Sequence, residues 1–449
     1  MGAHGTAVGR HRLSRLGGVL CAASLLVAAT ACGSDNKGAS SATTAASASA
    51  STAGATTTAG GTQTTAAGSA TTSGSTASDK STIKIGYLGP QSGPFAPTFA
   101  PALAGIQTYV KYWNDRGGAN GHQLDLEVYD TQSNSSAVLA GARKAVGDGM
   151  QAIISNDVYF DTAAPYLAEQ KMPVFGFGIT LGFYGPDKQT FFSPMGNWIA
   201  YQSNVGMKYL VDQGHSKIAV LSDPNPGNAN AAHAISNAVK TVGGELVYEN
   251  YGVDDTNSAA LLAVAQAAKD AGAQAVYTNF YGTAPAQLQA NLNQIDANAV
   301  VLNGSLGFSP DIPKQFGSAV EGLTSEVFTA TWLSPNIPGV KLYMDAMKQY
   351  APDQLENNSA LTGWATMLLF GGALQALGAE KPTLESIAAA ANTLQNFNGD
   401  GLMQPVSFPQ LHESMAPCMG FGQVKSEVWT LTAGTDTNPF ICGTPVAAS

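Results

Sequence analysis

The sequence predicts an α/β protein built as two doubly wound, parallel-sheet lobes. Short apolar segments alternate with amphipathic segments of ten or more residues, and this alternation restarts after residue 197. Strands that alternate with helices of this length form parallel sheets covered on both faces. The part of the chain with this pattern, from about residue 81 to residue 449, is too long for one ordinary hydrophobic core. We therefore expect two lobes.

The first unit alternates four strands with three helices. The doublet Gly117-Gly118 marks the end of its first helix, because glycine is a common helix terminator. Runs of β-branched and apolar residues identify the strands. We expect strands at 83–88, 124–129, 152–155 and 173–177, and helices at 102–114, 137–148 and 162–170.

The second unit repeats this rhythm, and Gly243-Gly244 again follows a helix. Two open parallel sheets side by side would direct the carboxyl ends of their strands toward a shared crevice, which is where doubly wound folds bind ligands. We expect helices at 200–213, 231–242, 258–271 and 284–294, and strands at 217–221, 246–251, 275–278 and 299–302.

The N-terminus has the layout of a secretory signal. Arg10, Arg12 and Arg15 precede an apolar run at 16–27, which is shorter than the ~20 residues of a membrane-spanning helix. Ala29-Thr30-Ala31-Cys32 resembles a bacterial lipobox, in which the cysteine is lipidated and becomes the new N-terminus. Lipoboxes usually carry leucine where this chain has Ala29, so simple cleavage stays open. We expect residues 1–31 to be the signal peptide.

Residues 32–80 are expected to be a disordered tether. From 33 to 79 the chain is almost entirely Ser, Thr, Ala and Gly, and it contains no apolar residue larger than alanine. Such a segment cannot bury enough surface to fold. At this length a flexible chain spans about 35 to 40 Å. Together the signal, Cys32 and the tether predict an extracytoplasmic protein anchored to the cell membrane by an N-terminal lipid.

The cysteines fit an exported protein. Cys21 lies in the signal and Cys32 is the lipidation site, which leaves Cys418 and Cys442 for the folded part. Two cysteines in an exported chain usually form a disulfide, and we expect one here. Their surroundings do not offer four ligands for zinc, and a redox pair is the weaker alternative.

Charge and motif content disfavour several classes of protein. The formal net charge is −10, and no cluster of Lys and Arg with interleaved aromatics occurs, so we expect no nucleic-acid partner. The glycine-containing segment 176–182 does not have dinucleotide-loop spacing. His122, His215, His233 and His412 stand apart in the sequence, and no nucleophile elbow, H-E-x-x-H or P-loop motif is present. We expect no enzyme activity, no metal and no cofactor.

Several segments resemble the periplasmic binding protein type I family, and in particular its Leu/Ile/Val-binding branch. The segment 85–94, IGYLGPQSGP, is similar to the family's opening strand and "SGP" loop. The segment 113–121, WNDRGGANG, is similar to its Asn-x-x-Gly-Gly-x-x-Gly turn. Residues 126–130, 149–154, 322–324 and 363–365 resemble further family segments in the same order.

The resemblance implies Rossmann-like lobes joined by a three-stranded hinge, with a ligand cleft between them. We expect crossings near 194–197, 327–331 and 398–404. The N-terminal lobe would then contain 81–196 and 330–400, and the C-terminal lobe 197–328 and 404–449. The implied function is capture of a small organic molecule by lobe closure and its delivery to the permease of an ABC importer. We expect a monomer. The alternatives are a sensor for a signalling partner and, more distantly, an extracellular hydrolase.

The resemblance also implies which loops touch the ligand. Thr180 matches a family threonine that helps to hold a ligand carboxylate, with a plain helix-cap role as its alternative. Ser305 stands where amino-acid receptors carry an acid for the ligand ammonium, and Asp157 or Asp223 could substitute for it. We therefore expect a ligand that is amino-acid-like, or one that is apolar or aromatic. Aromatic residues beside buried strands often belong to the core, and that alternative stays open for those near the cleft. The expected contacts are Ser92, Phe99, Asn156, Tyr159, Phe160, Gly178, Ile179, Thr180, Asn225, Tyr281, Ser305 and Phe308.

Overall fold

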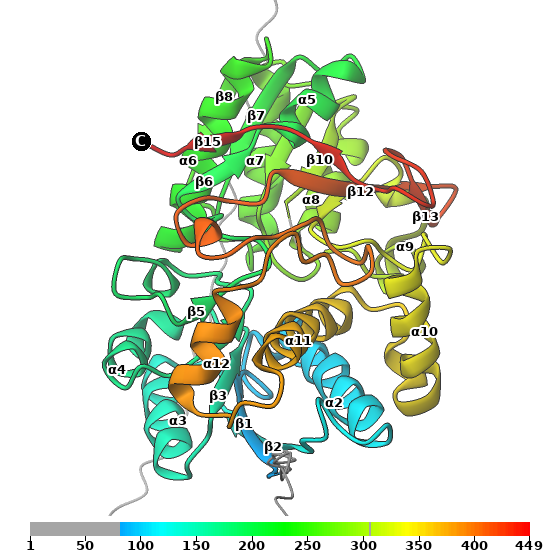
Figure 1. Ribbon diagram of the computed structural model, residues 1–449. Helices are drawn as coiled ribbons and strands as arrows, with labels where there is room; N and C mark the ends of the chain where they lie inside the picture. Colours follow the sequence, from blue (N-terminus) through cyan, green and yellow to red (C-terminus); the bar gives the residue numbers. More distant parts are fainter. Residues whose placement is uncertain (1–80, 305–306) are drawn as a thin grey trace, which may run out of the picture. The chain divides into compact units, whose positions relative to one another are not determined.

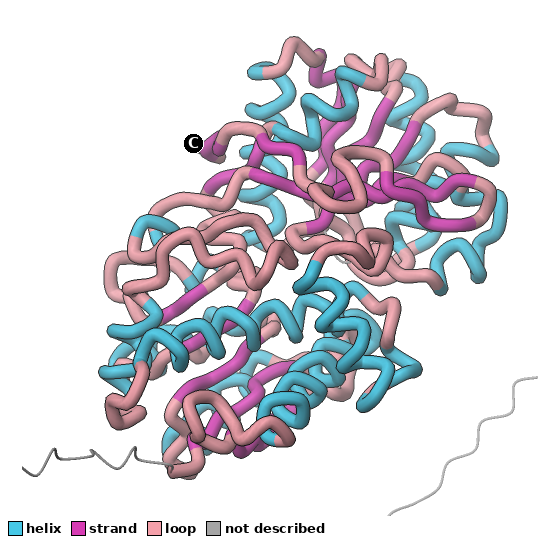
Figure 2. Tube along the Cα trace, turned by 45° about the vertical axis from the view of Figure 1, so that its right-hand side comes forward, coloured by secondary structure: helices cyan, strands magenta, loops and turns pink. Residues whose placement is uncertain are grey.

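The computed structural model describes residues 81–304 and 307–449 (Figure 1). The expected signal peptide, lipidation site Cys32, tether at 32–80 and ligand contact Ser305 lie outside these residues. Within the described part, the strands form two large sheets and one separate two-stranded pair, and helices lie on the faces of the large sheets (Figure 2). We call the sheet that starts at residue 83, with its helices, the first lobe, and the sheet that starts at residue 217, with its helices, the second lobe.

The first sheet is parallel, with the order β2-β1-β3-β4-β5. β1 lies inside the sheet between β2 and β3, and every one of its residues except Lys84 is buried, as expected for a parallel strand covered on both faces. Its strands are β1 (Ile83–Gly89), β2 (Leu124–Asp130), β3 (Ala152–Ser155), β4 (Val174–Gly176) and β5 (Phe191–Phe192).

Helices cover both faces of the first sheet because successive strand residues point to opposite sides. Ile85 and Tyr87 pack with α2, α10, α11 and α12, whereas Leu88 and Ile153 pack with α3 and α4. The helices are α1 (Ala96–Phe99), α2 (Pro101–Asn114), α3 (Ser135–Gly147), α4 (Ala164–Glu169), α10 (Pro338–Tyr350), α11 (Asn358–Leu377) and α12 (Leu384–Ala391).

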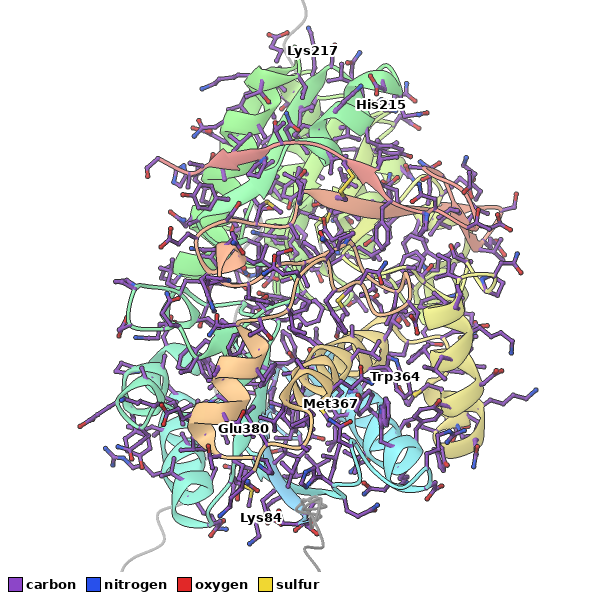
Figure 3. All side chains as sticks on the ribbon, viewed as in Figure 1. Lys84, His215, Lys217, Trp364, Met367 and Glu380 are labelled. Atoms are coloured by element: carbon purple, nitrogen blue, oxygen red, sulfur yellow. A yellow bond between two sulfur atoms is a disulfide. The ribbon has the colours of Figure 1, made fainter. Side chains whose placement is uncertain are left out.

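Helix α11 is the centre of the first core. By length and composition it is the one helix of the described residues that could cross a membrane, but 83% of its most apolar window is buried in the protein, as in a core helix. Trp364 and Met367 lie on this helix (Figure 3) and are fully buried. Glycines let α11 pack closely on α2: a Cβ on Gly105 would lie 1.9 Å from the carbonyl oxygen of Ala360.

The second sheet has the order β13-β12-β11-β10-β9-β7-β8, with β14 paired to β12. β7 to β11 run parallel, and β12 to β14 add antiparallel pairs. Its strands are β7 (Lys217–Leu221), β8 (Glu245–Asn250), β9 (Ala275–Thr278), β10 (Val300–Asn303), β11 (Thr324–Val327), β12 (Cys418–Lys425), β13 (Val428–Leu431) and β14 (Ile441–Cys442). A separate pair joins β6 (Tyr201–Ser203) to β15 (Pro445–Ala447).

Helices also cover both faces of the second sheet. Ile218 and Val220 pack with α5 and α6, whereas Ala219 and Leu221 pack with α7 and α8. Asn225 and Asn257 cap α6 and α7 by accepting hydrogen bonds from backbone N–H groups of the first turn. The helices are α5 (Val205–Asp212), α6 (Pro226–Thr241), α7 (Ser258–Asp270), α8 (Ala284–Gln294) and α9 (Asp311–Phe316).

A disulfide joins Cys418 to Cys442, as the sequence predicted. The two residues are directly opposite each other on the antiparallel strands β12 and β14. The bond ties the C-terminal strands to the second sheet.

The chain passes between the lobes through paired extended segments. Asn197 donates its N–H to the carbonyl oxygen of Ser414 at 2.8 Å, and Ala330 donates to Leu402 at 2.7 Å. Bridges pair Gly196 with Met415 and Thr329 with Met403. The first crossing therefore pairs with residues 414–415, and the second crossing pairs with residues 402–403.

The third crossing lies later than the sequence analysis placed it. Val406, Phe408 and Leu411 belong to the core of the first lobe, so the chain remains with that lobe beyond 398–404. The ring of Phe408 lies 5.3 Å from that of Phe192 at the end of the first sheet. The chain then joins the second sheet at β12.

Some predicted elements also differ in the structure. The helix expected at 200–213 begins as strand β6, because residues 201–203 pair with the C-terminal segment of the chain, and α5 follows. The helix expected at 162–170 is broken into a 3-10 turn at Phe160–Thr162 and α4. Helix α6 starts earlier than 231, at Pro226, because Asn225 caps it. Long-range pairing and local capping set these boundaries.

Candidate functional site

The carboxyl ends of the two parallel sheets face each other. Lys84, near the start of β1, and Lys217, at the start of β7, lie at opposite ends of Figure 3. The strands therefore run from the two ends toward the middle, and the loops that follow them meet there. Ligands of doubly wound folds bind at this edge of a sheet.

Apolar and aromatic side chains from both lobes form one cluster at this edge, which we call the interlobe cluster. The ring of Tyr281, which follows β9, lies 5.7 Å from the ring of Phe99 in α1 and 6.4 Å from that of Phe95. Phe95 also lies 5.9 Å from Tyr159, which follows β3. Its buried members are Phe99, Val158, Phe177, Ile179, Met195, Trp198, Ile199 and Ala231, and Phe95, Tyr159, Tyr184, Tyr281 and Phe328 pack against them.

The loop after β4 supplies the first-lobe backbone of this site. Gly178 has φ +57°, and a Cβ there would lie 2.2 Å from the hydroxyl oxygen of Tyr184, so the position requires glycine. That hydroxyl lies 2.8 Å from the carbonyl oxygen of Gly178 and 2.6 Å from that of Gly196. The indole N–H of Trp198 donates to the carbonyl oxygen of Phe177 at 3.2 Å. The loop is thus held by aromatic side chains on the side of the first crossing.

The start of α6 supplies the second-lobe counterpart. Asn225 caps the helix, and its Oδ1 accepts from the N–H of Gly227 at 2.9 Å. A Cβ on Gly227 would lie 3.5 Å from the carbonyl oxygen of Ile179, so this turn packs against the first-lobe loop. Tyr281 donates its hydroxyl to Oδ1 of Asn228 at 3.1 Å. The predicted residues Ile179, Asn225 and Tyr281 are therefore close together.

Several buried polar atoms at these strand ends have no hydrogen-bond partner among the described residues. Buried polar groups are normally hydrogen-bonded, because an unpaired one costs about 1–3 kcal/mol. All of them follow, or end, strands whose carboxyl ends face the other lobe, so a ligand or water held between the lobes would satisfy them. They are Ser155 Oγ, Asn156 Nδ2, Thr180 Oγ1, Asn279 Oδ1, Asn303 Nδ2 and Oδ1, and Thr329 Oγ1.

Three of the predicted contacts lie away from the interlobe cluster. Phe160 packs in the outer core of the first lobe, 5.4 Å from Phe183 and 5.7 Å from Phe191, so it is a structural residue. Phe308 packs in the core of the second lobe, 4.5 Å from Trp429. Ser92 is exposed and donates its hydroxyl to Asp130 at 2.7 Å, which holds the loop after β1.

Carboxylates are numerous at this edge. Asp157 accepts a hydrogen bond from Thr131, and burial raises the pKa of its carboxyl. Asp223 accepts from the N–H of Asn225 at 2.7 Å and from Nδ2 of Asn228 at 2.8 Å, and burial raises its pKa as well. Neither forms an ion pair within the described residues. No group of three His, Cys, Asp or Glu in the described residues could hold a metal.

Sequence reasoning counted Phe95 among the aromatic residues near the cleft loops, but it did not single out Asp255 or Asn279 as contacts. Asn279 is the residue immediately after β9, and Asp255 lies between β8 and α7, so position after a parallel strand was the available signal. Phe95 is in the loop after β1, and its ring contacts Tyr159 of its own lobe and Tyr281 of the other lobe.

The fold and this arrangement agree with known proteins. A family model described as periplasmic binding protein matches residues 82–428. The protein therefore belongs to the periplasmic binding protein family. A curated relative, the leucine-, isoleucine-, valine-, threonine-, and alanine-binding protein of Pseudomonas aeruginosa, is 25% identical over 198 residues, 40% of this chain and 50% of the relative. The chain thus spans about half the length of the curated relatives it matches.

Solved structures share the fold at low sequence identity. A branched chain amino acid ABC transporter from Thermus thermophilus, with bound valine, has a TM-score of 0.68 and 17% identity, over 78% of this chain and 95% of that one. A solute binding protein from R. palustris, in complex with benzoate, has a TM-score of 0.64 and 14% identity, over 80% of this chain and 98% of that one. At these identities the likeness shows the fold alone.

Proposed function

We propose that the protein captures a small organic molecule between its two lobes and delivers it, chemically unchanged, to the permease of an ABC importer. The observation that carries the proposal is the set of unpartnered buried polar atoms at the interlobe edge, beside the interlobe cluster. A polar ligand would supply the missing hydrogen bonds, and its apolar part would contact the rings. The family to which the chain belongs supports the same function.

The geometry suggests how residues share this task. Thr180 and Asn156 would bind a polar group of the ligand from the first lobe, and Asn279 would do so from the second. Phe99, Tyr159 and Tyr281 would cover its apolar part. Opening would require bending of the crossing segments, which are the covalent links between the lobes, and separation of the rings that pack across the interlobe cluster.

The cellular arrangement is part of the proposal. Lipidation of Cys32 would anchor the chain to the membrane, with residues 33–79 as a tether that lets a monomer reach the permease. The signal-like arginines, the apolar run and the motif before Cys32 support this. Loss of membrane retention in a Cys32→Ala variant tests it.

Ligand binding is the direct test. We would measure the thermal midpoint of the full-length chain against branched amino acids, aromatic acids, amines, amides and sugars, because a ligand of the folded state raises the midpoint by mass action. A hit confirmed by calorimetry supports the proposal, particularly if a Thr180→Val, Tyr281→Ala double variant loses it. A chain that binds none of these compounds, and that is not required for uptake of any of them by its own cells, would contradict the function.

A further inference from the structure

A cavity of about 320 Å³ opens beside the interlobe cluster. The first lobe contributes Phe95 and Thr98 to its lining, and the second lobe contributes Asp255, Tyr281 and Gln287. Residues from both lobes are therefore needed to form it, and a molecule there would contact both of them. Of the ligand contacts predicted from the sequence, only Tyr281 lines this cavity.

Two aromatic rings form one wall of the cavity. The rings of Phe95 and Tyr281 lie 6.4 Å apart, with an angle of 77° between their planes. Both side chains are only partly buried, so parts of the rings remain accessible. The face of an aromatic ring attracts a cation that comes within about 6 Å of its centre, and the attraction grows when the cation is shielded from water.

The charged group in the lining is an acid. Asp255 is half-buried and accepts the N–H of Tyr281 at 3.4 Å. It belongs to no ion pair among the described residues, and no Lys, Arg or His within that part of the chain lines the cavity. Burial, and then the nearby charge of Asp223, raise the pKa of Asp255 to about 6. Asp255 thus faces the cavity without a balancing cation, and the buried carboxylate of Asp223, which does not line the cavity, adds to the negative charge near it.

The ends of two helices oppose this negative charge only in part. The cavity lining includes Ser258 at the start of α7 and Ala284 at the start of α8. A helix N-terminus is equivalent to about half a positive charge. Two such ends do not exceed the charge of Asp255 and Asp223, and Asn257 already accepts hydrogen bonds from the first turn of α7. The net field in the cavity favours a cation over an anion.

From this combination we infer that the protein selects a positively charged organic ligand, an amine or a quaternary ammonium. Its cationic group lies in this cavity between the carboxylate of Asp255 and the rings of Phe95 and Tyr281. The inference rests on the proposed function and specifies its substrate class. The unpartnered atoms of Thr180 and Asn156 remain for a neutral or polar end of the same molecule.

Three probes of nearly equal size test the charge preference: benzylamine, benzyl alcohol and benzoate. Titration calorimetry of the full-length chain at neutral pH should show benzylamine binding at least tenfold more tightly than benzyl alcohol, and benzoate binding least. Equal or tighter binding of benzoate or benzyl alcohol overturns the inference. Absence of benzylamine binding also overturns it, whereas the proposed function stands as long as any other compound of the wider panel binds.

Substitutions then locate the cationic group. Asp255→Asn keeps the size of the side chain and its ability to accept from Tyr281, so it should remove most of the preference for benzylamine over benzyl alcohol. Phe95→Leu should reduce the same preference through loss of the ring. Asp254→Asn is the matched control, since Asp254 is the exposed neighbour whose Oδ1 accepts from Thr256 at 2.7 Å. An unchanged preference in both Asp255→Asn and Phe95→Leu would place the cation elsewhere and refute the site.

Discussion

The ring of Phe99 in the first lobe lies 5.7 Å from the ring of Tyr281 in the second, although 182 positions separate the two residues in the chain. Their contact joins the loops that follow β1 and β9. A tilted aromatic pair contributes about 0.5–1.5 kcal/mol beyond the area it buries. The pair therefore couples the position of the lobes to the site between them.

Replacing Tyr281 by alanine should weaken ligand binding at least tenfold, because the ring contacts Phe95 and Phe99 and its hydroxyl holds Asn228. Calorimetry with a compound identified in the ligand panel measures the effect. Tyr166→Ala is the control, since Tyr166 lies on α4, where Arg143 is 5.8 Å from its ring, outside the interlobe cluster. Equal affinity losses in both variants would show a general structural effect.

Thr180→Val should change stability and binding in opposite directions. Thr180 Oγ1 is buried and has no partner among the described residues, so removal of the hydroxyl should leave the ligand-free protein equally stable or up to about 1 kcal/mol more stable. Ligand affinity should fall about tenfold, as expected for one lost hydrogen bond. Thr366→Val removes a hydrogen bond to the Thr362 carbonyl oxygen inside α11, so it should lower stability and leave ligand affinity unchanged. A Thr180→Val protein with lower stability and normal affinity would refute the assignment.

Gly105→Ala should destabilise the first lobe by about 2–4 kcal/mol, because the new methyl group would overlap the Ala360 backbone and force α2 and α11 apart. Urea denaturation measures the change. Gly147→Ala provides a matched comparison at the end of α3, where a Cβ meets nothing within 4 Å. There the higher helix propensity of alanine should leave stability unchanged or raise it by up to about 1 kcal/mol. Similar losses at the two positions would argue against the close helix crossing.

Glu326 should make the stability of the protein fall as the pH rises from about 4.5 to about 8. Its carboxyl group is buried, and a Cβ on Gly304 would lie 3.2 Å from Oε1 of Glu326. Tyr277 donates its hydroxyl to this carboxyl at 3.4 Å, and burial raises the pKa of Glu326 from 4.5 to about 8. Because the folded-state pKa is the higher one, its contribution to stability is full below pH 4.5 and is lost as pH rises through about 8. The loss amounts to about 5 kcal/mol.

Glu326→Gln should therefore abolish this part of the decline, so that the variant gains on the natural protein as pH increases. Denaturation at several pH values between 5 and about 9 follows the difference. Glu245→Gln, at an exposed position of β8, should leave the pH dependence unchanged. Parallel pH curves for the natural protein and Glu326→Gln would contradict the prediction.

The disulfide should stabilise the second lobe by about 3 kcal/mol, because it closes a loop of 24 residues in the unfolded chain. A Cys418→Ser, Cys442→Ser variant should lose this amount in denaturation, and reductant should lower the midpoint of the natural protein but not that of the variant. Detection of two free thiols in the exported protein would contradict the bond itself.

Local signals in the sequence determined much of the fold. The alternation of apolar strands with amphipathic helices depends on residues a few positions apart, so it identified the parallel strands β1 to β4 and β7 to β10. It also placed Tyr159, Ile179, Thr180 and Tyr281 after strand ends. The pairing of Cys418 with Cys442 followed from their number in an exported chain.

Only the tertiary structure decided which loop side chains share a site. Tyr159 and Phe160 are neighbours in sequence, yet one packs at the interlobe cluster and the other in the core of the first lobe. Phe95, Asp255 and Tyr281 come together because one loop of the first lobe meets two loops of the second lobe. In a loop no periodicity sets the direction of a side chain, and contacts between distant segments depend on the packing of both sheets. For that physical reason the sequence determined the strands that lead to the site, and the packing of the lobes decided its lining.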